Sequence, residues 1–250
     1  MRDPRVVVAP GTLAEGACLE LEAGEARHVA TVLRRAVGSE LVALDGAGRS
    51  ACVRVESVHR HRVTVQVGTV VRHPPQPGPA LDLALAVLHT SAMDWAVQKA
   101  TELGVRRLVP LVAARSQAGG RAAERRLEHW RRTAMQALKQ CGRPWALEID
   151  PPRTLDELVG EPPPGPVVAA SDGVPVARSD VGIADTTLVV GPEGGFDDRE
   201  TAALREAGWP RIVLSRHTLR AETAAVAGVA ILADMLWANT APTPVHGPTV

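Results

Sequence analysis

The sequence predicts an α/β protein in two parts: a small, mainly β N-terminal part and a larger C-terminal part built on a parallel sheet. Three observations lead to this prediction. Short β-rich runs separated by turn residues fill the chain up to His73. Residues 73–79 then contain four prolines and one glycine, which form neither a helix nor a central strand. After them, apolar strand-like runs alternate with helical segments, as in a parallel sheet.

The N-terminal part is predicted to span residues 1–73. We expect a helix at residues 25–35 and a stiff linker at residues 74–79, because prolines restrict the backbone. The remainder is expected to be strands joined by turns at Asp45, Gly46 and Gly48. The predicted strands are residues 5–8, 40–44, 49–56 and 62–67.

The C-terminal part is predicted to span residues 80–240, with residues 241–250 as a frayed tail. The first predicted strand is followed by a helix that Ser91 and Asp94 cap and that Gly104 ends. The predicted strands are residues 83–88, 108–112, 167–170, 188–190 and 212–214.

A glycine-rich loop at residues 191–195, Gly-Pro-Glu-Gly-Gly, follows a strand predicted at residues 187–190. Its glycines and proline exclude strand and helix, so the chain turns sharply, and backbone groups there are open to a ligand. Asp197 and Glu200 form a capping box for the next helix, which Gly208 closes. The loop lacks the P-loop and dinucleotide fingerprints. A plain connecting turn is the alternative interpretation.

A second strand–loop–helix unit follows, with a strand at residues 211–214 and an apolar helix starting near Ala221 that we expect to be buried. Charges at the mouth of a buried element indicate either function or ion pairing. The simpler alternative is an ion pair of Glu222 with Arg216 or Arg220. Two such units in succession predict one shared pocket at the carboxyl ends of neighbouring parallel strands. The polar loop between strand and helix contains Arg216, His217, Arg220, Glu222 and Thr223.

Five blocks of sequence occur in an order typical of one family. They are Arg-His-Val with Val-Leu-Arg and Asp-Gly (within residues 27–46), residues 98–105, residues 137–143, Gly-Pro-Glu-Gly-Gly (191–195) and Leu-x-x-x-x-Leu-Arg-x-Glu-Thr-Ala (214–224). Together they resemble the RsmE family of small-subunit ribosomal RNA methyltransferases, over about residues 4–237. Five ordered blocks are far more specific than any one of them.

The resemblance implies a fold and an activity. It implies an N-terminal domain similar to PUA β-barrels and a C-terminal SPOUT domain. In that domain the chain end passes through a deep trefoil knot to form the S-adenosylmethionine pocket. It also implies a homodimer that methylates N3 of a uridine in the decoding region of the 16S rRNA of the small ribosomal subunit.

The same resemblance implies site residues. Uridine N3 carries a proton and is a poor nucleophile until that proton leaves, so the site needs a base or a group that stabilises the anion. Arg220 is the candidate for stabilising charge on the uracil oxygens. Glu222 is the candidate base, or the residue that orients Arg220, and Glu193 is the rival base. The implied cofactor-binding residues are Val190, Gly191, Pro192, Glu193, Gly194, Leu214, Ser215, Leu219, Arg220, Thr223 and Ala224.

RNA binding is also indicated by local charge. The chain carries 28 basic and 28 acidic residues, but residues 115–143 hold eight basic against two acidic ones, a balance of +6. The alternative for the basic residues is an ordinary solvated helix face with Arg125, Arg132 and Lys139. The alternative for His28 is a core or surface histidine without a role in RNA binding. The predicted RNA-binding residues are His28, Arg34, Arg35, Arg115, Arg125, Arg132 and Arg143.

Other classes of protein are not expected. The scattered Cys18, Cys52 and Cys141 form neither a disulfide framework nor a metal motif, which favours the reducing cytoplasm and no bound metal. Residues 1–4 lack an apolar signal core, and the apolar stretch of residues 221–238 contains charges, so we expect neither secretion nor a membrane span.

Three positions depart from the family pattern. Residues 90–92 replace a basic residue, Ala114 stands where an acid is common, and Ser215 replaces a frequent glycine. They concern the RNA contacts and the shape of the cofactor loop more than cofactor binding itself. Two alternative functions remain open. One is a SPOUT methyltransferase for another RNA base or a ribose 2′-hydroxyl, and the other is a non-catalytic ribosome-binding protein.

Overall fold

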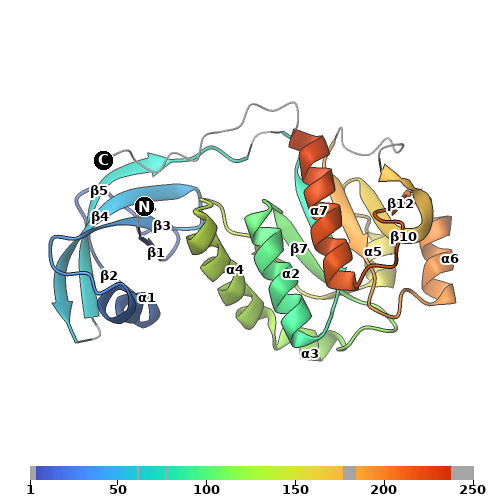
Figure 1. Cartoon of the computed structure of the whole chain (residues 1–250), viewed down its shortest axis with the longest axis horizontal. Helices are drawn as coiled ribbons and strands as arrows, with labels where there is room; N and C mark the ends of the chain where they lie inside the picture. Colours follow the sequence, from blue (N-terminus) through green and yellow to red (C-terminus); the bar gives the residue numbers. More distant parts are fainter. Residues whose placement is uncertain (1–3, 61, 77, 177–183, 238–250) are drawn as a thin grey trace. The chain divides into compact units, whose positions relative to one another are not determined.

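The computed structural model describes residues 4–60, 62–76, 78–176 and 184–237, and these form two compact units (Figure 1). Within the described residues, unit 1 comprises residues 4–76 and 135–146, and unit 2 comprises residues 78–134 and 147–237. The predicted linker therefore marks one boundary between the units. The inclusion of residues 135–146 in unit 1 was not predicted. The predicted tail lies outside the described residues.

Unit 1 is built on a mixed five-stranded sheet with the order β1-β3-β4-β5-β2. β1 and β3 are parallel, and the other neighbours are antiparallel. β1 and β2 are the two ends of this order, so closure into a barrel stays a prediction. The strands are β1 (Arg5–Val7), β2 (Cys18–Glu20), β3 (Glu40–Leu44), β4 (Arg49–His59) and β5 (Arg62–Arg72).

The helix of unit 1 is shorter than predicted. α1 (Ala23–Arg27) continues into a π-helix at His28–Val32. Arg34 has a φ of 49°, a left-handed conformation that ends the helix before the predicted residue 35.

Hydrogen bonds, an ion pair and apolar packing connect residues 135–146 to the rest of unit 1. Arg5 Nη1 donates to the carbonyl oxygen of Gln140 at 2.9 Å and so satisfies an otherwise open group at the end of helix α4 (Leu127–Cys141). Lys139 Nζ lies 2.8 Å from Glu25 Oε1, with only 12% and 10% of the two side chains exposed. Trp145 Nε1 donates to the carbonyl oxygen of Pro74 at 3.0 Å.

Unit 2 is built on a parallel sheet with the order β12-β10-β11-β6-β7-β8, in which β9 also pairs with β7. All recorded pairings in it are parallel. The predicted mixed α/β class with a parallel sheet is therefore confirmed. The strands are β6 (Leu81–Ala86), β7 (Arg107–Val112), β8 (Glu148–Ile149), β9 (Arg153–Thr154), β10 (Pro166–Pro175), β11 (Thr186–Val190) and β12 (Arg211–Val213).

Helices cover both faces of this sheet, which explains why every residue of β6 and β11 is buried. On one face, Leu83 and Leu85 pack in a core with residues of α2 and α7, which lie side by side (Figure 1). On the other face, Ala84 packs with residues of α5 and α6. The helices are α2 (Thr90–Glu102), α3 (Gly120–Glu124), α4, α5 (Leu155–Gly160), α6 (Asp198–Glu206) and α7 (Ala221–Trp237).

Two helix predictions need correction. The N-cap of α2 is His89, without a side-chain cap bond, because Asp94 instead lies 2.8 Å from His129 Nε2. The cap by Ser91 and Asp94 was therefore wrong. α7 is not buried all round, since Ile231 is 36% exposed although Leu232 next to it is fully buried. None of the helices in the described residues is long and apolar enough to cross a membrane.

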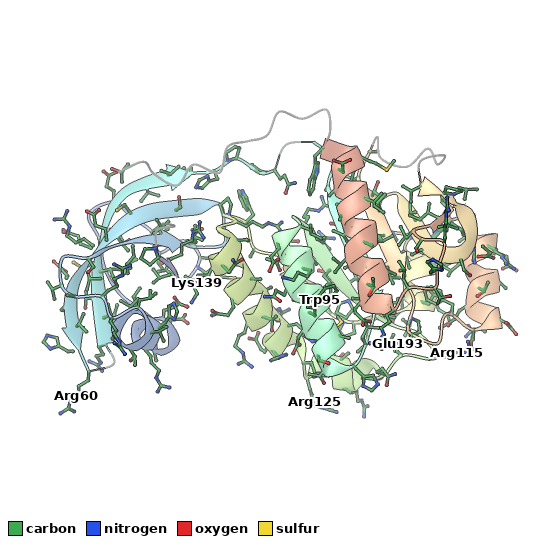
Figure 2. The ribbon with its side chains drawn as sticks, in the orientation of Figure 1. Arg60, Trp95, Arg115, Arg125, Lys139 and Glu193 are labelled. Carbon is green, nitrogen blue, oxygen red and sulfur yellow. The ribbon has the colours of Figure 1, made fainter. Side chains whose placement is uncertain are left out.

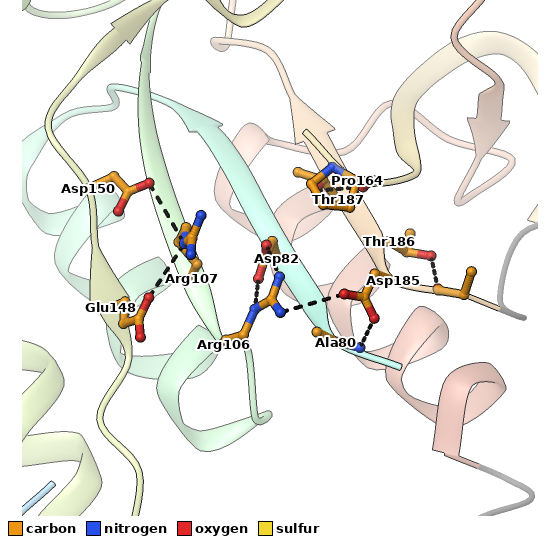
Figure 3. Close-up of polar contacts among 11 residues, drawn as sticks. Ala80, Asp82, Arg106, Arg107, Glu148, Asp150, Pro164, Asp185, Thr186 and Thr187 are labelled. Carbon is orange, nitrogen blue, oxygen red and sulfur yellow. Dashed lines mark hydrogen bonds and ion pairs between the residues drawn. The ribbon is translucent and has the colours of Figure 1, made fainter. Parts of the chain in front are cut away.

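Ion pairs link the amino ends of neighbouring strands in two groups, one around Arg106 and one around Arg107 (Figure 3). None of these residues lines the cavity at the carboxyl ends of the strands. Arg106 donates from Nε and Nη2 to the two carboxylate oxygens of Asp82, at 3.0 and 2.7 Å. Its Nη1 lies 3.5 Å from Asp185, in the segment before β11. Arg107 in turn lies 3.4 Å from Glu148 of β8. The contacts of Arg106 thus gather around the buried carboxylate of Asp82, and the contact of Arg107 with β8 forms a separate group.

Candidate functional site

A cavity of about 420 Å³ lies at the carboxyl ends of β11 and β12 and beside residues 168–171 of β10. The loop after β11 contributes Gly191, Pro192 and Glu193 to its lining, and the loop after β12 contributes residues 214–219. The structure therefore brings the two predicted loops to one cavity. Of the predicted cofactor-binding residues, the following line it: Val190, Gly191, Pro192, Glu193, Leu214, Ser215, Leu219 and Ala224. Gly194, Arg220, Thr223 and the candidate base Glu222 are not among the lining residues.

The glycine-rich loop turns as the sequence predicts. Gly195 has a φ of 70° and donates its N–H to the carbonyl oxygen of Pro192 at 2.8 Å, which closes the turn. A Cβ on Gly191 would stand 3.0 Å from the ring of Phe196, so a larger residue there would displace that ring. The helix after the loop starts with the predicted capping box of Asp197 and Glu200.

Glu200 also connects this loop to the loop after β7. It is only 7% exposed; its Oε2 accepts from the N–H of Asp197 at 2.9 Å and its Oε1 from the N–H of Ala114 at 2.7 Å. Ala114 contributes through its backbone, which any residue except proline supplies. The departure from the family pattern at Ala114 therefore leaves this contact intact. Beside it, Arg115 Nη1 donates to the carbonyl oxygen of Gly194 at 2.8 Å.

The loop after β12 keeps its charges open to solvent. Arg216 and Arg220 are exposed and Glu222 is half-buried, and no ion pair joins them in the part of the chain that the structure describes. The alternative that these charges simply neutralise one another is therefore not supported. Ser215 Oγ accepts from the N–H of His217 at 3.1 Å, a turn contact that a glycine lacks. Arg220 lies at the start of α7, where its carbonyl oxygen accepts from the N–H of Ala224.

The third wall of the cavity comes from β10 and was not predicted. The register of β10 against β12 shifts between Ala169 and Val174, and Ser171 in this irregular stretch lines the cavity. Asp172 accepts hydrogen bonds from Arg211 and Arg205, and the Arg211 hydrogen bond is the main cause that holds the pKa of Asp172 below its usual value. The sequence signal was a polar Ser-Asp-Gly run directly after a predicted buried strand.

The basic residues Arg125, Arg132 and Lys139 do not form one helix face. Arg125 lies before the start of α4, and Lys139 is engaged by Glu25. The alternative of a solvated face shared by Arg125, Arg132 and Lys139 is therefore wrong. Arg125 and Arg132 are exposed. Figure 2 shows Arg115, Arg125 and Glu193 at the same edge of unit 2.

The remaining predicted RNA-binding residues lie in unit 1. Arg34 is exposed on the turn that ends the π-helix, whereas His28 and Arg35 are half-buried. Arg143 is also half-buried, and burial lowers its pKa to about 10. Arg143 therefore remains charged at neutral pH, but only part of its side chain is open to a partner.

His28 is expected to be neutral at pH 7. Its burial, and secondarily the positive charge of Lys139, lower its pKa below the usual value near 6.5. Because the unfolded chain binds this proton more readily, the His28 contribution to the free energy of unfolding is present above about pH 6.5 and is lost as the pH falls. An NMR titration should show a midpoint below pH 6.5, and His28→Gln should weaken the acid dependence of stability. A midpoint above 6.5 would contradict this.

Comparison with known proteins gives consistent matches. Residues 75–233 match the family model described as RNA methyltransferase domain. A relative from Aquifex aeolicus, ribosomal RNA small subunit methyltransferase E, is 32% identical over 222 residues, which are 87% of this chain and 94% of the relative. A protein of the same name from Mycobacterium tuberculosis is 31% identical over 84% of each chain.

Solved structures match over almost the whole chain as well. A putative methyltransferase from Legionella pneumophila, in complex with the cofactor SAM, superposes with a TM-score of 0.86 at 28% identity, covering 93% of this chain and 97% of the other. The ribosomal RNA small subunit methyltransferase E from Neisseria gonorrhoeae, bound to S-adenosyl methionine, superposes with a TM-score of 0.84 at 26% identity, covering 94% and 98%. This chain therefore belongs to the RNA methyltransferase domain family and, within it, to the ribosomal RNA small subunit methyltransferase E family.

Proposed function

We propose that this protein transfers the methyl group of S-adenosylmethionine to N3 of a uridine in the 16S rRNA of the small ribosomal subunit. The observation that carries the proposal is the cavity that the loops after β11 and β12 form together at the carboxyl edge of the sheet. Ligands of open α/β sheets bind at this edge. Two structural neighbours that resemble the chain over nine-tenths of its length contain this cofactor.

The residues of the cavity suit such a cofactor. Its volume, about 420 Å³, lies within the range of small-molecule sites. Val190, Leu214 and Leu219 offer apolar surface for a planar base, and the turn at Gly191 leaves backbone groups open for hydrogen bonds. The carboxylate of Glu193 matches a cationic ligand in charge. When bound, the cofactor supplies an activated methyl group on a sulfonium.

Side chains of the protein are proposed to stabilise and deprotonate the uridine acceptor. Methyl transfer is an in-line displacement, so the protein mainly positions the reactants and excludes water. Arg220, exposed at the start of α7, is free to donate to the uracil oxygens and to stabilise the anion that forms when N3 loses its proton. Glu193 lines the cavity and Glu222 does not, which favours Glu193 as the proton acceptor.

We also propose that unit 2 contains a trefoil knot and that unit 1 closes into a PUA-like barrel. The protein is proposed to form a homodimer and to act in the cytoplasm. The exposed Ile231 of α7 and Trp95 of the neighbouring α2, which are 36% and 40% exposed, support a second copy as the partner of these two helices. The basic residues Arg34 in unit 1 and Arg125 and Arg132 in unit 2 are proposed to contact RNA phosphates.

The direct test uses purified protein, labelled S-adenosylmethionine and small ribosomal subunits from a strain that lacks this enzyme. Nucleoside mass spectrometry of the rRNA is expected to show 3-methyluridine. A different methylated nucleoside would favour a related activity on another base or on a ribose hydroxyl. Subunit binding without any methylation would favour the non-catalytic protein. Naked 16S rRNA in a parallel reaction would show whether the assembled subunit is needed.

A further inference from the structure

The glycine-rich loop, residues 191–196, is fixed at both ends but needs an additional contact in its middle. β11 leads into it, and the capping box of Asp197 and Glu200 holds its exit. Gly191, Glu193 and Gly195 line the cavity between these two ends. A glycine-rich segment loses much conformational entropy when it is ordered, so its cavity-facing conformation depends on contacts from outside the loop.

The side chain of Arg115 provides such a contact. Its Nη1 donates to the carbonyl oxygen of Gly194 at 2.8 Å, and this carbonyl belongs to the one residue between Glu193 and Gly195. The aliphatic part of Arg115 packs against the same glycine, because a Cβ on Gly194 would stand 3.2 Å from Arg115 Cδ. The guanidinium and the stem of Arg115 thus contact a single peptide of the loop.

The backbone around Arg115 is itself held in place. Ser116 Oγ accepts from the N–H of Ala113 at 2.9 Å, and the N–H of Ser116 donates to the carbonyl oxygen of Ala113 at 3.0 Å. The N–H of Ala114 donates to the buried Glu200 at 2.7 Å. Arg115 therefore projects from a compact turn that is attached to the same helix, α6, that follows the glycine-rich loop.

This geometry conflicts with a simple phosphate contact. Arg115 is one of the predicted RNA-binding residues because of its charge. A guanidinium that donates to a fixed carbonyl oxygen makes a charge-assisted hydrogen bond, which is stronger than one between neutral groups. An arginine that contacted only RNA phosphates would not need to pack its aliphatic side chain against Gly194.

We propose that Arg115 is a positioning residue that holds the glycine-rich loop in its cofactor-binding conformation. The inference rests on the proposed function, since it assigns a role to Arg115 at the cofactor cavity. The expected signature is a split between kinetic constants. Loss of the Arg115 contact with Gly194 should weaken the affinity and raise the KM for S-adenosylmethionine, whereas kcat at saturating cofactor should change little, since this role gives Arg115 no contact with the acceptor.

The first experiment measures the Kd of S-adenosylmethionine by calorimetry for the wild type and for Arg115→Met, Arg115→Lys and Arg121→Met. Arg115→Met should bind about tenfold more weakly, the loss expected for one hydrogen bond from a charged donor. Arg115→Lys keeps a cationic donor and should recover part of the affinity. Arg121→Met is the matched control, because it removes an exposed arginine of α3 that does not contact the loop.

A double-mutant cycle tests the contact itself. Gly194→Ala is expected to weaken cofactor binding in the wild type, because its methyl group presses on Arg115 Cδ. In the Arg115→Ala background this cost should be much smaller. Additive effects, or an Arg115→Met variant with unchanged cofactor affinity and reduced RNA affinity, would overturn the inference alone. A wild-type protein that binds no S-adenosylmethionine would overturn the proposed function as well.

Discussion

Replacement of Arg220 by alanine is expected to lower kcat for methyl transfer by about 10²–10³-fold, the usual loss when one donor to a developing anion is removed. Arg220 directly precedes α7 and follows the loop residues 214–219 that line the cavity. Because it is exposed, the free energy of unfolding should change by less than about 0.5 kcal/mol. Methyl incorporation under single-turnover conditions, with thermal unfolding as the stability control, measures both quantities.

The conservative variant sharpens this test. Arg220→Lys keeps the charge but loses the planar fork that matches two oxygens, so its rate should lie between those of wild type and Arg220→Ala. Cofactor affinity should remain near the wild-type value in both variants if Arg220 acts on the acceptor. An unchanged rate in Arg220→Ala would refute the role, and a loss of cofactor affinity equal to the loss of rate would move Arg220 to the cofactor.

The second large effect is expected on stability, at the amino ends of the strands. Arg106→Met leaves the carboxylate of Asp82, whose side chain is only 4% exposed, without its bidentate partner. We expect a loss of about 3 kcal/mol in the free energy of unfolding, at the low end for a broken buried ion pair because Arg106 itself is partly exposed. Urea denaturation monitored by circular dichroism measures this loss.

A second variant separates the charge effect from lost packing. Arg106→Met combined with Asp82→Asn removes the unpaired buried charge and should recover part of the stability, because a buried amide costs less than a buried carboxylate. A loss below about 1 kcal/mol in Arg106→Met would show that solvent compensates the unpaired carboxylate of Asp82 and would contradict this prediction. Cofactor affinity should stay unchanged in both variants, since neither Arg106 nor Asp82 lines the cavity.

Local patterns in the sequence predicted most of the parallel sheet and two of the three cavity walls. The strand before Gly191 and the capping box at Asp197 depend on neighbouring residues, so they are readable from the chain alone. β2 was missed because its three residues, Cys-Leu-Glu, lack the β-branched side chains that marked the equally short β1 and β12. The predicted cap of α2 does not form because the carboxylate of Asp94 contacts His129, which is 35 residues away, instead of the backbone at the start of the helix.

Features that depend on distant partners could not be predicted. The wall from β10 depends on Asp172 and its contacts with Arg205 and Arg211, which are 33 and 39 residues away. The assignment of Lys139 to unit 1 depends on Glu25, which is 114 residues away. The role proposed for Arg115 could not be predicted either. The sequence gives its charge, but its hydrogen-bond acceptor, the carbonyl oxygen of Gly194, is 79 residues away.

The membership of α4 has a consequence for modularity. Its residues 127–134 belong to unit 2 and its remaining residues to unit 1, so the two units are not consecutive cassettes along the chain. A fragment that begins after the proline-rich segment would contain residues 135–146 but neither Glu25 nor Arg5. Lys139 would then lack its ion-pair partner, and the carbonyl oxygen of Gln140 would lack its donor. A chimaera that exchanges the N-terminal part between relatives is therefore expected to keep these contacts only if residues 135–146 are exchanged with it.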